Sequence, residues 1–232
     1  MANRPAFFVD DSETAFVKVE AFDFTWFAGT ALARRQMSMR SLHDVILRVH
    51  PESRILEVSR MSQVNLGVQL SAFNLTFKTA KFGKIITVEC AFQASKVFEY
   101  GGPFLDLLDK SSFDAKRDRR LSDAGRLTGF RFFGDDWPND PPTAFYDWVY
   151  INALSRHSDL ASAVTDYDVF TDIAFNPQKS INCQANSVAL YVSLVKRGEL
   201  ELALSEKSSF IEIVRNRNFV TINQNYKRLF DN

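Results

Sequence analysis

The chain has 232 residues, of which 46% are hydrophobic and 24% charged, with 28 basic and 28 acidic residues. That length suits one large domain or two small ones of a globular protein. A formal net charge of zero argues against binding nucleic acid by charge alone, so any DNA contact must use a local patch or a captured base. No apolar run reaches the ~18 residues of a membrane span, and no signal peptide begins the chain. We therefore expect a cytoplasmic protein without a membrane partner.

The two cysteines, Cys90 and Cys183, and the three histidines do not have the spacing of metal ligands. We expect neither a metal nor another cofactor. Cys90 has no histidine near it in the sequence, so a small buried residue is the favoured interpretation over a catalytic nucleophile.

In chain order, residues 16–27 alternate apolar and polar side chains with a change of phase near Ala21, which predicts a strand with a bulge. Apolar residues from Leu42 to Val49 recur at helical spacing before Pro51, which predicts a helix. Residues 134–142 suit a rigid loop, and the polar segment after Phe210 suits a docked or partly disordered tail. Further extended segments are expected at 54–59, 66–77, 127–133 and 169–175, and helices at 111–121, 142–157, after Ser158, and at 185–196.

The most informative stretch runs from Ile85 to Phe98. Residues 85–87 predict a strand, and a helix should begin at Val88 with Thr87 as its N-cap and end near Gly101. At roughly 100° per residue, Glu89, Phe92, Gln93 and Lys96 share one face of that helix. Glu89 and Lys96 would then lie roughly 10 Å apart along the axis and could meet on a bound group such as a sugar. A solvated helix face remains the alternative interpretation.

Three motifs resemble those of NADAR domains. Residues 70–73 (Leu-Ser-Ala-Phe) are similar to the Leu-Ser-Asn-Phe motif that opens these domains. Residues 88–96 (Val-Glu-Cys-Ala-Phe-Gln-Ala-Ser-Lys) resemble their Val-Glu-His-x-x-Gln-Ala-x-Lys helix. Residues 171–172 and 182–186 resemble their closing motif more loosely. Ala72 and Cys90 depart from the usual Asn and His.

The run from residue 42 to 198 looks like the NADAR subfamily that accompanies DarT-type DNA ADP-ribosyltransferase toxins. The expected fold is α+β: a single NADAR-like domain, mainly helical around a small mixed sheet. We divide the chain into an N-terminal strand region (1–40), a NADAR-like catalytic domain (41–205) and a C-terminal tail (206–232).

The resemblance implies an antitoxin that hydrolyses the N-glycosidic bond between ADP-ribose and guanine in DNA and releases ADP-ribose. Its partners would be ADP-ribosylated DNA and a DarT-like toxin encoded nearby. Glu89, Lys96 and Asp172 are the candidate catalytic residues, because carboxylates near the anomeric carbon can transfer protons and a lysine can act as a nucleophile. The alternatives are an N-glycosidase of small phosphorylated ribosides, as in riboflavin synthesis, and a non-catalytic ADP-ribose reader or toxin blocker.

Two further sets of residues complete the expected site. The substrate-binding candidates are Ser71, Phe73, Asn74, Gln93, Trp137, Tyr146, Asn182, Gln184 and Asn186. The DNA-contact candidates are Arg34, Arg35, Arg119 and Arg120.

Overall fold

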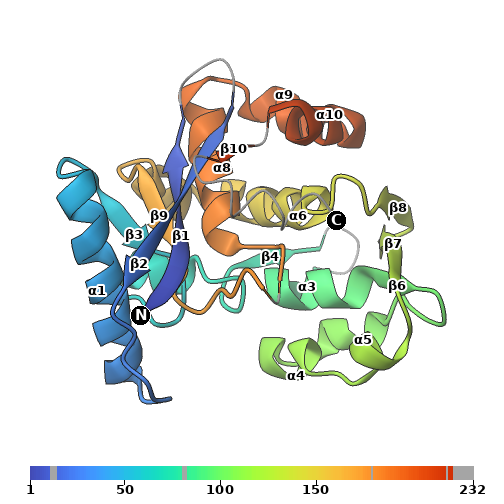
Figure 1. Ribbon diagram of the computed structural model, residues 1–232. Helices are drawn as coiled ribbons and strands as arrows, with labels where there is room; N and C mark the ends of the chain where they lie inside the picture. The colour runs from blue at the N-terminus through green and yellow to red at the C-terminus, as the bar shows by residue number, and fades with distance from the viewer. Residues whose placement is uncertain (11–14, 80–82, 179, 218, 222–232) are drawn as a thin grey trace.

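The computed structural model describes residues 1–10, 15–79, 83–178, 180–217 and 219–221 (Figure 1). The strands are β1 (Ala2–Val9), β2 (Val17–Phe24), β3 (Ile55–Glu57), β4 (Thr76–Lys78), β5 (Ile85–Thr87), β6 (Lys96–Phe98), β7 (Leu127–Phe132), β8 (Asp135–Pro138), β9 (Val169–Thr171) and β10 (Phe219–Thr221). The helices are α1 (Leu32–Val49), α2 (Asn65–Gln69), α3 (Val88–Ser95), the 3₁₀ helix η1 (Leu105–Asp109), α4 (Ser112–Lys116), α5 (Arg120–Asp123), α6 (Ala144–Ser155), α7 (Ser158–Val164), α8 (Gln184–Lys196), α9 (Leu200–Ser205) and α10 (Lys207–Arg217). The expected α+β class is confirmed.

The largest sheet in the described part of the chain has the strand order β10-β2-β1-β9-β3. It is mixed, because β1 runs antiparallel to β2 and β9 whereas β3 runs parallel to β9. Helix α1 lies against one face of this sheet and α8 against the other (Figure 1). Side chains alternate between the faces of a strand, and accordingly Phe7 and Phe170 join the α8 core while Ala6 and Val169 join the α1 core.

The bulge predicted near Ala21 is absent from β2. The pairing of β1 with β2 is uninterrupted from Ala2 opposite Phe24 to Val9 opposite Val17. The change of phase in the sequence has another cause, since Val19 packs into the core on the α8 side and Phe22 into the core on the α1 side. A strand buried on opposite faces at its two ends therefore gives the same pattern as a bulged one.

Four other predictions of local structure are corrected. Helix α1 begins at Leu32, before the apolar pattern from Leu42 to Val49 that predicts it. The sequence does not indicate this earlier start because the first turn is exposed and carries no apolar pattern. Residues 66–77 are not one extended segment: most of α2 lies there, too short to show a period, and a turn follows it. The helix expected at 111–121 is interrupted because Asp118 Oδ1 accepts a hydrogen bond from the Arg120 backbone N–H, a local bond that competes with helix continuation. The loop expected at 134–142 contains β8, which pairs with β7.

The described part of the C-terminal segment packs on the domain, since Phe210 and Val214 of α10 are buried in the main core. Residues 222–232 of the expected tail lie outside the described residues. The expected boundary at residues 40/41 falls inside α1, and the division into three segments stays a prediction. No helix in the described ranges is long and apolar enough to cross a membrane.

Candidate active site

Helix α3 lies between α6 and the short helices α4 and α5 (Figure 1), and Glu89 in its first turn is buried. The predicted start of this helix is confirmed: Thr87 is the N-cap, and its hydroxyl accepts a hydrogen bond from the Cys90 N–H at 3.2 Å. The Glu89 N–H donates to the Ala72 carbonyl at 2.9 Å, which ties the two motifs together. Every residue of α3 is buried, with Glu89 only 4% exposed. The polar face of α3 is therefore not solvated, and Cys90 is a buried residue as expected.

Gln93 and Lys116 contact the Glu89 carboxylate. The Gln93 side-chain N–H donates to Glu89 Oε1 at 2.8 Å, and Lys116 Nζ lies 3.7 Å from the same oxygen. Gln93 is only 5% exposed, and its carbonyl Oε1 has no hydrogen-bond partner among the described residues. A buried acceptor without a donor costs stability, so this oxygen marks a place where a ligand hydroxyl or amide can donate.

Lys96 reaches the site from a strand and not from the predicted helix. Helix α3 ends at Ser95, and Lys96 begins β6, where it pairs with Phe130 of β7. The expected end near Gly101 was wrong because strand pairing overrides the helical pattern. Gly102 has a different role: at φ +87°, it packs so closely that a Cβ would lie 2.2 Å from the Lys96 carbonyl oxygen. A glycine is needed there to keep the Lys96 backbone in place.

The Lys96 ammonium lies over the Phe92 ring, with Nζ 4.6 Å from the ring centroid. Burial lowers the pKa of Lys96 to about 8; nearby Glu89 opposes this shift and Lys116 adds to it. At pH 7 roughly a tenth of the molecules then carry a neutral amine, against less than a thousandth for an ordinary lysine. A nucleophilic lysine requires a pKa lowered in this way.

Asp172, the third candidate catalytic residue, directly follows β9 and is buried. Its Oδ1 accepts hydrogen bonds from the backbone N–H groups of Ala174 and Phe175, and its Oδ2 accepts from Gln184 at 2.9 Å. The Gln184 carbonyl in turn accepts from the Ala72 N–H at 2.8 Å. Asp172 and Gln184 thus join the closing motif to the 70–73 motif. Burial raises the pKa of Asp172 to about 6.

Tyr146 of α6 lies within electrostatic reach of both acidic candidates. Its ring packs edge-on against Phe92 at 5.0 Å between centroids. Burial raises the pKa of Tyr146 well above its usual value, and Glu89 and, more weakly, Asp172 add to the shift. Buried Glu89 and Asp172 therefore lie near the same tyrosine, and half-buried Lys96 joins this group through its electrostatic interaction with Glu89.

Other predicted substrate contacts lie elsewhere or have other partners. Trp137 packs in the core against Phe145 and Trp148. Asn186 forms a hydrogen bond with the buried Asp147, and Asn74 is exposed and donates to the Val68 carbonyl at 2.8 Å. Ser71 is buried, and its backbone carbonyl accepts from the N–H groups of residues 74 and 75. The side-chain oxygen of half-buried Asn182 is buried without a partner in the described structure.

The four predicted DNA-contact arginines differ in their surroundings. Arg34 is exposed at the start of α1, Arg35 is half-buried and lies over the Trp26 ring, and Arg119 is exposed before α5. Arg120 is engaged by two carboxylates, with guanidinium nitrogens 2.7 Å from Asp106 and 2.8 Å from Asp118. A paired arginine is a poor phosphate ligand, so Arg120 fits a structural role better than DNA contact.

Glu57 is a buried acid that no motif indicated. Its carboxyl group accepts hydrogen bonds from Ser59 Oγ at 2.5 Å and from the Ile173 N–H at 2.9 Å, and it lies 2.7 Å from Thr171 Oγ1. These contacts hold the residues on both sides of Asp172. Burial, and then the nearby Asp172, raise the pKa of Glu57 to about 8.

The raised pKa of Glu57 predicts a pH-dependent stability. Between its unfolded value of 4.5 and about 8, the folded protein keeps a proton that the unfolded chain has lost, so stability falls as pH rises through this window. Glu57→Gln cannot titrate and should remove up to about 1.4 kcal/mol per pH unit of this fall. Urea unfolding at pH 6.5 and 8 measures the effect, with the exposed Glu52→Gln as control. The same slope in Glu57→Gln and wild type would contradict the assignment.

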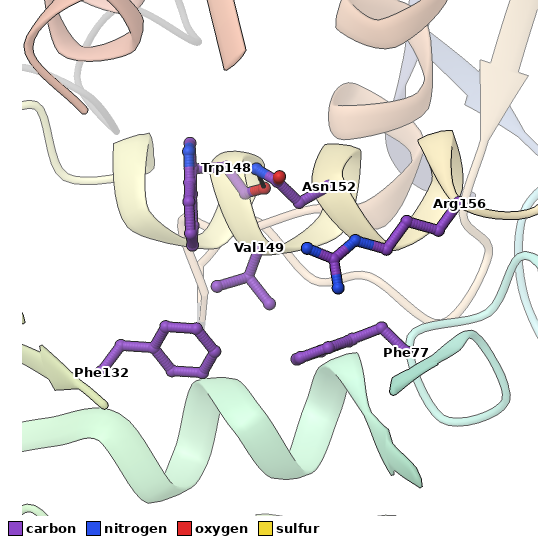
Figure 2. Close-up of a pocket in the computed structure, with 6 residues that line it drawn as sticks. All are labelled: Phe77, Phe132, Trp148, Val149, Asn152 and Arg156. Carbon is purple, nitrogen blue, oxygen red and sulfur yellow. Dashed lines mark hydrogen bonds between the residues drawn. The ribbon is translucent and has the colours of Figure 1, made fainter. Parts of the chain in front are cut away.

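A separate pocket lies between α6 and the strands β4 and β7 (Figure 2). It is lined by Phe77, Phe132, Trp148, Val149, Asn152 and Arg156. Figure 2 shows the rings of Phe77 and Phe132 on one side of the opening and the side chains of α6 on the other. None of the lining residues is acidic, and none belongs to the cluster around Glu89. This pocket therefore does not have the groups for glycosidic chemistry.

The described residues contain no group of three or more His, Cys, Asp or Glu side chains that could hold a metal ion. The candidate site instead contains two buried carboxylates, an amine of lowered pKa and an amide oxygen without a partner among the described residues. Together they define a candidate polar active site in an α+β domain. Such a site can transfer protons and form an imine with a carbonyl compound.

A comparison with known protein families identifies the family of this domain. The sequence model of the DarT1-associated NADAR antitoxins matches residues 2–224, nearly the whole chain. The chain belongs to the family of DarT1-associated NADAR antitoxins. A search of curated proteins found no match.

Proposed function

We propose that this antitoxin is an ADP-ribosylglycohydrolase that removes ADP-ribose N-linked to guanine in DNA and so reverses the toxin's modification. The observation that carries the proposal is that buried Glu89 interacts electrostatically with half-buried Lys96, whose amine stands over the Phe92 ring and has a lowered pKa. The family supplies the association with a DarT1 toxin, and the candidate site contains groups suited to cleaving an N-glycosidic bond.

The proposed reaction begins with opening of the distal ribose. A carboxyl group at Glu89 moves the proton between the ring oxygen and the guanine amino nitrogen, which leaves an imine between that nitrogen and C1 of the ribose. The neutral Lys96 amine adds to C1, and the guanine amine departs with a proton, leaving an imine on Lys96. Water hydrolyses this imine and releases open-chain ADP-ribose, which recloses. Atoms and charges balance without an external oxidant or reductant.

Gln93 and Asp172 have supporting roles in this proposal. The unpartnered Gln93 Oε1 accepts a hydrogen bond from a ribose hydroxyl, while its N–H group orients Glu89. Asp172, through Gln184, fixes the backbone of the 70–73 motif against the N-terminus of α3. The Phe73 ring lies 5.1 Å from Lys116 Nζ, which in turn lies 3.7 Å from Glu89 Oε1, and this proximity supports a role for Phe73 beside the substrate.

The direct test is release of ADP-ribose from a single-stranded oligonucleotide that carries one ADP-ribosylated guanine. We expect the wild-type protein to release free ADP-ribose and restore the unmodified oligonucleotide, also in the presence of EDTA, because the described residues form no metal site. Mass spectrometry of both products measures the reaction. Phosphorylated ribosides serve as the comparison substrate. Turnover of these alone would favour the small-molecule N-glycosidase, and tight ADP-ribose binding without turnover would favour a reader.

A further inference from the structure

A row of positive charges and aromatic rings leads from Glu89 to the surface. Lys116 Nζ lies 3.7 Å from Glu89 Oε1 and 5.1 Å from the centre of the Phe73 ring. The Arg60 guanidinium lies 4.7 Å from the Phe73 ring and 5.9 Å from the Phe113 ring. Arg117 stacks on Phe113 at 3.8 Å. We call Arg60, Phe73, Phe113, Lys116 and Arg117 the cation–aromatic track.

Hydrogen bonds hold the two halves of the track together. The Ser112 hydroxyl of α4 donates to the Phe73 carbonyl at 3.0 Å, and it lies 2.8 Å from the hydroxyl of Thr87, the N-cap of α3. Helix α4, which carries Phe113 and Lys116, is thus fixed against the 70–73 motif and the start of the catalytic helix. These hydrogen bonds hold the track next to the candidate active site.

The outer cations of the track are not neutralised. Arg60 and Arg117 are exposed, and neither has a carboxylate at ion-pair distance within the described ranges. Arg120, only three residues after Arg117, is by contrast paired with Asp106 and Asp118. Phe113 is 42% exposed although it is a large apolar residue. Unpaired guanidinium groups stacked on exposed rings offer both a phosphate ligand and a flat surface for a base.

We propose that the cation–aromatic track binds the nucleotide next to the modified guanine, with its base stacked on the Phe113–Arg117 surface and its phosphate bound by Arg60 and Arg117. This inference rests on the proposed function. The ADP part of the substrate also carries a base and phosphates, so the chemistry alone fits both. The exposure favours the DNA strand, because the track opens outward from buried Glu89 to solvent, where a polymer must leave the site.

The test compares three ligands on two variants, Phe113→Ala and Arg117→Gln. The ligands are the ADP-ribosylated oligonucleotide, ADP-ribosylated guanosine without flanking nucleotides, and free ADP-ribose. Matched controls are Phe133→Ala, at an exposed phenylalanine in the β7–β8 turn, and Arg48→Gln, at an exposed arginine in the last turn of α1. We expect each track variant to lower kcat/KM on the oligonucleotide about tenfold more than on the nucleoside, mainly through KM, as expected for loss of one stacked base. The controls should leave that ratio unchanged.

Two other outcomes on active wild-type protein overturn the proposal. Equal losses on oligonucleotide and nucleoside, with weaker binding of ADP-ribose by calorimetry, would assign the track to the ADP part. Equal ratios in track variants and controls would remove it from substrate binding altogether. Wild-type protein that hydrolyses neither modified substrate would instead refute the proposed function. In that case, binding of an unmodified oligonucleotide, measured by fluorescence anisotropy, still decides the track: weaker binding in the variants than in the controls supports it, and equal binding overturns it.

Discussion

Glu89→Gln is expected to lose hydrolysis of ADP-ribosylated guanine while still binding ADP-ribose. The amide keeps an oxygen that can accept the hydrogen bond from Gln93, so the fold of the site is preserved, but it cannot take or give a proton. General acid–base catalysis contributes about 10²- to 10⁴-fold, and we expect a loss of kcat in that range. Product release from the modified oligonucleotide measures turnover, and isothermal calorimetry measures ADP-ribose binding.

Glu99→Gln is the matched control, because Glu99 lies at the start of the turn after β6 and pairs with Arg126 at the surface. It undergoes the same chemical change close in sequence to the site and should keep wild-type activity. If Glu89→Gln retained near-normal turnover, Glu89 would be a binding residue and the catalytic assignment would fail. If Glu89→Gln lost ADP-ribose binding as well, the carboxylate would contribute to ligand binding and not specifically to the chemical step.

Only part of the local structure around the candidate site could be predicted from the sequence. The start of α3 was predictable because a β-branched strand, a threonine cap and a helical face follow one another within a few residues. The sequence predicts Lys96 at the site from helical spacing, but Lys96 lies in a strand. Its pairing with β7 depends on residues 127–132, far along the chain. Its amine nevertheless stands over Phe92, on the face that helical spacing had indicated.

The charged surroundings of the site could not be predicted in the same way. A sequence does not show whether an arginine faces a carboxylate, so it indicates Arg120, which is paired, for DNA contact and does not single out Arg60, which lies over the Phe73 ring. Glu57 lies in a short apolar strand without a motif, and its contacts with Thr171 and Ile173 join residues more than a hundred positions apart. Trp137 is an aromatic residue of the kind that stacks on a base, but its burial against Phe145 depends on tertiary packing.

The lowered pKa of Lys96 predicts how the reaction depends on pH. The reactive species is the neutral amine, whose fraction rises with pH until it levels off above the pKa of about 8. In the proposed mechanism, kcat should therefore rise about tenfold from pH 6 to pH 7 and flatten beyond pH 8. A mechanism that uses only water and Glu89 does not require this rise of kcat with pH. Initial rates under saturating substrate from pH 6 to pH 9 measure the profile.

Lys96→Arg is expected to abolish the covalent step and to lower kcat by at least about a hundredfold. Arginine keeps the positive charge over Phe92 but remains protonated and cannot form an imine with the ribose aldehyde. Sodium borohydride added during turnover reduces an imine to a stable amine, so the wild-type protein should gain one ADP-ribosyl adduct, located on Lys96 by peptide mass spectrometry. Lys196→Arg, at the exposed end of α8, should still be trapped on Lys96. No adduct on the wild type, together with substantial turnover by Lys96→Arg, would make Lys96 a ligand of the substrate and leave the bond to be cleaved by water activated at Glu89.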